Sequence, residues 1–180
     1  MSPAAAPVVR IPVGVVIERR KAASQWIDFV WIPVGVLPDE PEMAPWTLLR
    51  EEGEAKSFYI GSATVDLYRS EAARYHENLM TGAPGIWVAL SPSDGEHPYT
   101  IAAVTADPAE GEGFNETAAY IVEQVPMPES IREAVANFVD EHHVEQAFVK
   151  RKQKPADPEA LAQRGPVSSP PKDRAKDRKG

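Results

Sequence analysis

The pentapeptide Ile11-Pro-Val-Gly-Val15 recurs without change as Ile32-Pro-Val-Gly-Val36. Each copy lies in a run rich in β-branched residues, at residues 8–17 and 29–37, and such runs predict β-strands. Strands accept proline and interior glycine mainly at edges, bends and bulges, so we predict that both strands are irregular or curved. One repeated pentapeptide does not establish a repeat architecture, because a solenoid needs several copies.

The rest of residues 8–149 alternates short strand patterns with two helical patterns. The better helix spans residues 128–143, where Ile131, Val135, Phe138, Val139 and His142 recur at the spacing of one face. A second helix is predicted at residues 71–80, followed by Gly82. Further strands are predicted at residues 46–50, 56–68, 85–90, 99–106 and 119–125.

Strands that do not alternate with crossover helices favour antiparallel pairing. The sequence therefore predicts an α+β domain, built as a mainly antiparallel curved sheet or half-open barrel with the C-terminal helix packed on it. Residues 128–143 supply that helix.

The charge of the chain changes sign after Phe148-Val149. Residues 1–149 carry 9 Lys and Arg against 23 Asp and Glu, whereas residues 150–180 carry 10 against 4. The second segment is rich in proline and has no aromatic residue, so it has too little apolar surface to offset the entropy of ordering. We predict a flexible N-terminus at residues 1–7, one folded domain at residues 8–149, and a disordered basic tail at residues 150–180.

Several classes of function are disfavoured by composition. The chain has no cysteine, which excludes disulfides, iron–sulfur clusters and thiolate zinc sites made by its own residues. It has no phosphate loop, dinucleotide fingerprint or nucleophile elbow. The N-terminus lacks a basic region followed by a long apolar stretch, so we expect a soluble cytoplasmic protein without a membrane segment.

Metal-capable side chains are concentrated at Glu141, His142 and His143, with His76 as a fourth candidate. Adjacent histidines point about 100° apart on a helix and do not converge as a pair four residues apart would. We therefore expect these groups to cap or pack the helix end, and we predict no bound metal and no cofactor. The alternative is a small metal- or cofactor-binding enzyme that uses the His142/His143 cluster.

Two features suggest a protein partner. The chain has four tryptophans in or beside predicted strands, Trp26, Trp31, Trp46 and Trp87. This position leaves two interpretations open, packing in the core and a surface that binds a partner. The basic residues that begin the tail could bind a polyanion, but the acidic domain would repel nucleic acid. We therefore predict contact with an acidic protein surface, or with this domain itself, through Lys150, Arg151, Lys152 and Lys154.

The stretch Ile11-Pro-Val-Gly-Val-Val-Ile-Glu-Arg-Arg20, together with Val125-Pro-Met-Pro-Glu129 and residues 140–152, resembles a bacterial family of proteins of unknown function, DUF3305. Members of that family are often encoded beside molybdenum formate dehydrogenase subunits and their assembly factors. The resemblance implies a non-catalytic accessory or assembly protein, whose partner is a molybdoenzyme subunit or its maturation factor. It carries over no catalytic residue.

Overall fold

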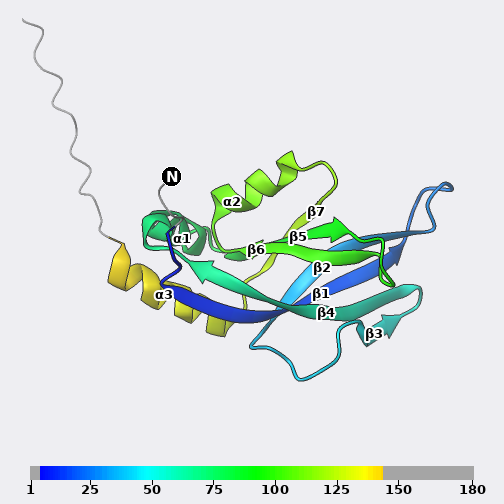
Figure 1. Ribbon diagram of the computed structural model, residues 1–180, viewed down its shortest axis with the longest axis horizontal. Helices are drawn as coiled ribbons and strands as arrows, with labels where there is room; N and C mark the ends of the chain where they lie inside the picture. Colours follow the sequence, from blue (N-terminus) through cyan, green and yellow to red (C-terminus); the bar gives the residue numbers. More distant parts are fainter. Residues whose placement is uncertain (1–4, 144–180) are drawn as a thin grey trace, which may run out of the picture. The chain divides into compact units, whose positions relative to one another are not determined.

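The computed structural model describes residues 5–143, in which seven strands form two antiparallel sheets (Figure 1). The four-stranded sheet has the order β2-β1-β4-β3, and the three-stranded sheet has the order β6-β5-β7. The strands are β1 (Val9–Lys21), β2 (Phe29–Pro38), β3 (Thr47–Glu52), β4 (Ala55–Leu67), β5 (Gly85–Pro92), β6 (Tyr99–Thr105) and β7 (Ile121–Pro126).

The predicted α+β class is confirmed, with the strands divided between two sheets and no closed barrel in residues 5–143. At the margins of the sheets, β2 runs beside β7 and β4 beside β6. The α-helices are α1 (Ala72–Leu79), α2 (Pro108–Gly113) and α3 (Glu129–His142). None of the described helices is long and apolar enough to cross a bilayer.

Strand β1 organises the larger sheet because it pairs along its length with β2 on one side and β4 on the other. Side chains alternate between the two faces of a strand, so odd-numbered residues of β1 share one face. Val13, Val15 and Ile17 on that face are fully buried in the core. Arg19 is the next residue on the same face, at the point where β1 leaves the core.

The predicted irregularity is confirmed for the second repeated segment, in β2, whereas β1, which carries the first, contributes no extra residue to either pairing. The pairing of β1 with β2 skips Val34, between Pro33 and Gly35, and the pairing of β1 with β4 skips Ile60. The neighbouring Gly61 has φ +144°, a conformation that side chains other than glycine rarely adopt. Val34 is thus an extra residue of β2, and Ile60 is an extra residue of β4 on the other side of β1. Such bulges increase the local twist and bend of a sheet.

The first hairpin is longer than the sequence pattern indicates. The sequence pattern ends the first strand at residue 17, but the charged residues 19–21 continue β1, with Arg19 opposite Trp31 and Lys21 opposite Phe29. The polar residues tolerate strand geometry because aromatic side chains of β2 lie beside them. A turn follows at residues 22–28, where the Trp26 amide donates a hydrogen bond to Ser24 Oγ at 3.1 Å.

Helix α3 packs on the core through the predicted face. Ile131, Val135, Phe138 and Val139 are all buried. The Phe138 ring meets the Tyr75 ring of α1 edge to face, with centroids 5.8 Å apart. The predicted packing of the C-terminal helix is therefore confirmed.

Buried Asn78 ties α1 to the smaller sheet. Its side-chain amide donates hydrogen bonds to the carbonyl oxygens of Gly85 and Ala106, each at 2.9 Å, and its Oδ1 accepts one from the Gly85 amide at 3.1 Å. One side chain thus satisfies three backbone groups where β5 begins and β6 has ended.

Phe138→Ala should lower the free energy of unfolding by about 3–5 kcal/mol, because it removes a buried ring and leaves a cavity between α1 and α3. Asn137→Ala is the matched control, since Asn137 is the exposed neighbour on the same helix. Chemical denaturation measures both variants. A loss below about 1 kcal/mol for Phe138→Ala would contradict this packing of α3.

Candidate protein-interaction surface

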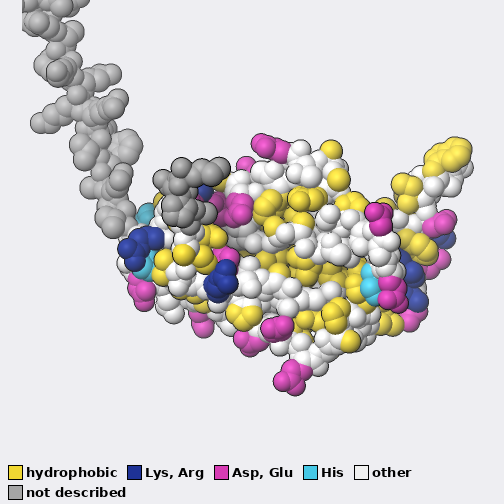
Figure 2. Space-filling model, in the orientation of Figure 1, with side chains coloured by type: hydrophobic (Ala, Val, Ile, Leu, Met, Phe, Trp, Pro, Cys, Tyr) yellow, Lys and Arg dark blue, Asp and Glu magenta, His cyan; other side chains and the backbone are white. Residues whose placement is uncertain are grey.

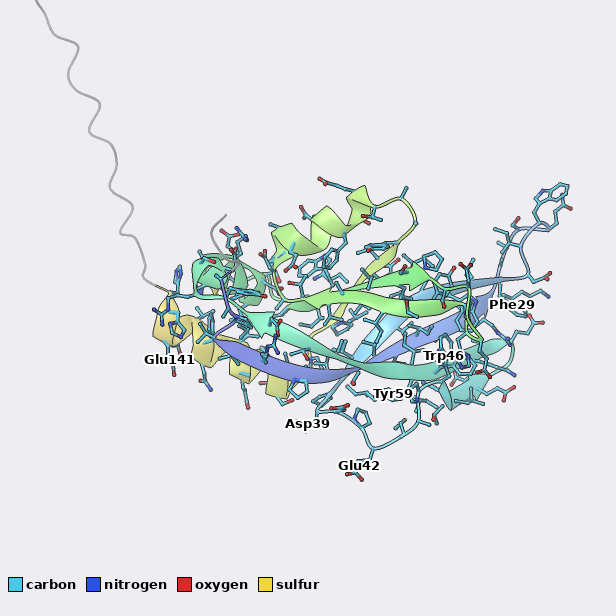
Figure 3. All side chains as sticks on the ribbon, in the orientation of Figure 1. Phe29, Asp39, Glu42, Trp46, Tyr59 and Glu141 are labelled. Carbon is cyan, nitrogen blue, oxygen red and sulfur yellow. The ribbon has the colours of Figure 1, made fainter. Side chains whose placement is uncertain are left out.

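The end of the domain that carries the β1–β2 hairpin is rich in aromatic side chains. We call this surface the aromatic end and define it by Arg19, Trp26, Ile27, Phe29, Trp31, Trp46, Phe58, His97 and Tyr99. The hairpin projects beyond the rest of residues 5–143 in Figure 1. Figure 3 shows Phe29 and Trp46 at this end and Glu141, on α3, at the opposite end.

Half-buried rings from both sheets form the base of the aromatic end. Trp31 lies at the centre, with its ring centroid 5.8 Å from that of Trp46, 5.8 Å from that of Phe58 and 6.4 Å from that of Tyr99. The Trp31 and Trp46 planes meet at 78°, an edge-to-face arrangement that aromatic pairs favour. The rings hold one another in place and fix the shape of this surface.

Trp46 has a strained backbone, with φ +68°. A bulky residue with positive φ is uncommon and persists only when its surroundings enforce it. Here the Trp46 amide donates a hydrogen bond to the Tyr59 carbonyl oxygen, and the His97 ring stacks on the indole with centroids 4.4 Å apart and planes at 12°. The strain is consistent with a ring held in a set orientation.

The tip of the hairpin is apolar and exposed. Trp26 has 87% of its surface accessible and Ile27 has 56%, and Phe29 and Val30 at the start of β2 are also exposed. Figure 2 shows hydrophobic side chains at the tip of the projecting hairpin. Contiguous exposed apolar residues, and tryptophan above all, are typical of surfaces that bind another protein.

The candidate metal residues lie at the opposite end and do not converge on a common point. The rings of His76 and His143 stack, with centroids 4.7 Å apart and planes at 18°. The lone pairs of an imidazole lie in its ring plane, so stacked rings do not aim them at one ion. His142 tilts over Phe138, with Glu141 Oε2 3.6 Å from its Nε2. Within residues 5–143, no three His, Asp or Glu side chains form a group that could hold a metal.

The predicted partner-binding residues Lys150, Arg151, Lys152 and Lys154 lie outside the described residues. The predicted domain boundary between residues 149 and 150 lies outside them as well. Of the tryptophans, Trp31 and Trp46 pack on each other at the base of the aromatic end, and Trp26 is exposed at the hairpin tip. Trp87 lies in β5, which is central in the smaller sheet.

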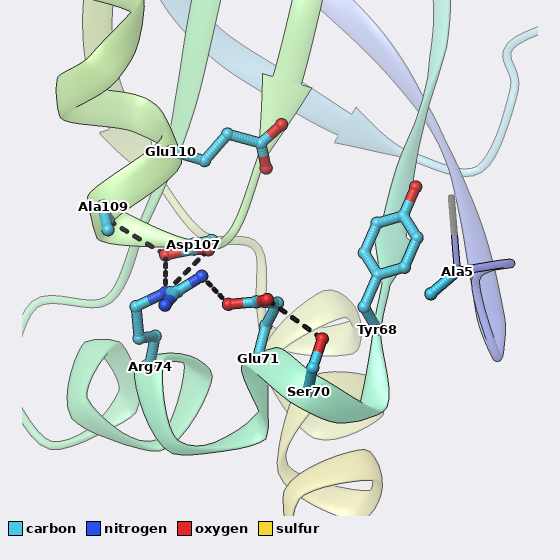
Figure 4. Close-up of a pocket in the computed structure, with 8 residues that line it drawn as sticks. All are labelled: Ala5, Tyr68, Ser70, Glu71, Arg74, Asp107, Ala109 and Glu110. Atoms are coloured by element: carbon cyan, nitrogen blue, oxygen red, sulfur yellow. Dashed lines mark hydrogen bonds and ion pairs between the residues drawn. The ribbon is translucent and has the colours of Figure 1, made fainter. Parts of the chain in front are cut away.

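A cavity of about 560 Å³ lies between α1 and α2, lined in part by Tyr68, Glu71, Arg74, Asp107 and Glu110 (Figure 4). Buried Asp107 accepts hydrogen bonds from Arg74 Nε at 2.8 and 2.9 Å. Its Oδ1 also caps α2 by accepting from the Ala109 amide at 2.9 Å. Glu71 pairs with the same Arg74, and Glu110 accepts from Thr105 Oγ1 at 2.7 Å.

The charged side chains of the cavity wall are thus already paired, Arg74 with Glu71 and Asp107, and Glu110 with Thr105. The Arg74–Asp107 pair joins α1 to the start of α2, and the carboxylate of Glu71 extends the same ion-pair network. The arrangement fastens the two helices together. It leaves the aromatic end as the stronger candidate for a functional site.

Tyr75 of α1 has a perturbed ionisation. Burial raises the pKa of its hydroxyl to about 12, and the nearby carboxylates of Asp107 and Glu110 act in the same direction. The hydrogen bond that Tyr75 Oη accepts from the Tyr68 amide, at 3.0 Å, opposes the shift in pKa. Tyr75 therefore stays neutral in the folded protein well above neutral pH.

The comparison with protein families gives one match. A family model described as "Protein of unknown function (DUF3305)" matches residues 12–152. No curated protein and no solved structure matches the chain.

Folded-state stability should fall between about pH 10 and pH 12 through Tyr75. The pKa of Tyr75 in the folded state lies above its unfolded value, so its contribution is complete below pH 10 and is lost as pH rises toward 12. Unfolding measured by denaturant at several pH values should show a steeper decline for the wild type than for Tyr75→Phe. Parallel curves for the two proteins would contradict the raised pKa.

Proposed function

We propose an accessory, protein-binding function for this chain, which belongs to the DUF3305 family of proteins of unknown function. The chain binds a partner protein through the aromatic end and contributes contacts to that partner rather than catalysis. The observation that carries the proposal is the exposed apolar tip of the β1–β2 hairpin, above all Trp26.

A fixed base beneath an exposed tip suits a docking surface. An exposed tryptophan gives up unfavourable contact with water when a partner covers it, and tryptophan is enriched among the residues that dominate binding energy. The interlocked rings of Trp31, Trp46 and Phe58 reduce the ordering that binding would otherwise require. A preorganised surface binds more tightly than a mobile one of equal area.

The partner in this proposal is a subunit or maturation factor of a formate dehydrogenase-type molybdoenzyme. The family resemblance supports this choice, because members are often encoded beside such genes. The acidic composition of residues 1–149 restricts the choice of partner. These residues would repel an acidic surface of the partner, except where basic groups of this chain face that surface.

The basic residues Lys150, Arg151, Lys152 and Lys154 meet that condition within this proposal. Charges at the rim of an interface mainly raise the rate of association and lose their effect as salt shortens the screening length. They attract an acidic partner, and the apolar tip then holds it.

The combined change Trp26→Ser and Ile27→Ser should reduce capture of the molybdoenzyme subunit by about tenfold or more, since it removes both exposed apolar side chains of the tip. The experiment purifies the tagged full-length chain from its own host and quantifies co-purified molybdoenzyme subunits. Thermal stability of the variant should stay near that of the wild type, because neither side chain is buried.

Met80→Ser is the matched control, because Met80 is 71% exposed at the end of α1, away from the hairpin. It should capture as much partner as the wild type. Equal capture by the hairpin variant and the wild type would overturn the docking surface. Specific loss of a different protein would leave the surface in place and overturn the molybdoenzyme assignment.

A further inference from the structure

The basic side chains near the hairpin differ in one respect, which is whether a carboxylate pairs with them. Four have such a partner, and these are Arg20 with Glu18, Arg50 with Glu52, Lys21 with Glu54 at 3.4 Å, and Lys56 with Glu51 at 3.4 Å. Arg19 has no ion pair and no side-chain hydrogen bond among residues 5–143. It is thus the cation of this end whose charge is free to meet a charge from outside.

Aromatic rings hold the Arg19 side chain in place. Its guanidinium carbon lies 4.2 Å from the centroid of the Phe29 ring and 6.0 Å from that of the Trp31 ring. Guanidinium stacks well on aromatic faces because it is planar and weakly hydrated. The Nε of Arg19 is buried without a hydrogen-bond partner, which leaves a donor unsatisfied in the unbound protein.

The position of Arg19 follows from the alternation of β1. It lies on the same face as Val13, Val15 and Ile17, whereas Arg20 lies on the opposite face of the strand. The exposed tip, with Trp26 and Ile27, belongs to the same hairpin. A cation and an apolar tip are therefore neighbouring parts of one surface.

From these contacts we infer that Arg19 recognises a carboxylate of the partner, on a protein segment in which bulky apolar residues flank an Asp or Glu. The inference rests on the proposed docking function and names the chemistry of the segment that docks. The carboxylate supplies the countercharge that Arg19 lacks, and the flanking apolar side chains cover Phe29 and the hairpin tip.

A protein segment fits these features better than nucleic acid. A phosphate could also pair with guanidinium, but a nucleic acid would bring many negative charges toward a domain that carries 23 Asp and Glu in residues 1–149. One carboxylate between apolar side chains brings a single charge and matches the exposed rings.

Two capped pentapeptides test the inference, acetyl-Gly-Phe-Glu-Phe-Gly-amide and the same peptide with Gln in place of Glu. Each is titrated into the ¹⁵N-labelled full-length chain, and the amide signals of the β1–β2 hairpin report binding. The wild type should bind the Glu peptide about five- to tenfold more tightly than the Gln peptide. Arg19→Gln should abolish this preference.

Arg20→Gln is the matched control, because Arg20 is the adjacent cation, points to the other face and already pairs with Glu18. It should keep the preference for the Glu peptide. Equal affinity for the two peptides in the wild type, or no saturable shift with either one, overturns the inference. A larger response to inorganic phosphate than to the Glu peptide overturns it in favour of phosphate recognition.

The same variants separate this inference from the proposed function. If Arg19→Gln captures the molybdoenzyme subunit as the wild type does, while the Trp26 and Ile27 double variant fails to, docking stands and carboxylate recognition is wrong. If both variants capture the subunit normally, the proposed docking surface is wrong as well.

Discussion

The pairing of β1 with strands on both of its sides is the constraint on which the rest of this structure depends. Because side chains alternate along a strand, one face of β1 passes without interruption from Val13, Val15 and Ile17 in the core to Arg19 at the surface. The core and the aromatic end are therefore consecutive parts of one alternating pattern. A slip of one residue in register would expose Val13, Val15 and Ile17 and turn Glu18 and Arg20 toward the core.

The other elements stabilise this arrangement from both ends of the strand. Near the helices, Asn78 and the Arg74–Asp107 pair join α1 to the smaller sheet and to α2, and α3 closes the core with Phe138. At the hairpin, the irregular pairing beside Gly35 and Gly61 bends the larger sheet. His97 of the β5–β6 connection also stacks on Trp46, so residues from both sheets build the base of the proposed docking surface.

Local pattern predicted the elements well, because short-range periodicity decides them. The strands that hold the repeated Ile-Pro-Val-Gly-Val segments and the buried face of α3 lie where the sequence indicates. Pattern failed where tertiary contacts decide. Residues 19–21 read as a connection because they are charged, but rings of β2 beside them extend β1. The stacking of His97 on Trp46 joins residues about fifty positions apart, and no local signal reports it. No sequence pattern distinguishes Arg19 from its basic neighbours, because whether a cation pairs with a carboxylate is decided by the fold.

Hydrogen exchange of the full-length chain, alone and in complex with the proposed molybdoenzyme subunit, tests the central claim most directly, since it maps the covered surface without any substitution. The account predicts slower exchange on binding in the β1–β2 hairpin, at residues 19–31, and in the connection that carries His97. It predicts unchanged exchange in α3, whose buried face already packs on the core. Slower exchange confined to α1 and α3, with the hairpin unaffected, would contradict the assignment of the aromatic end as the binding surface.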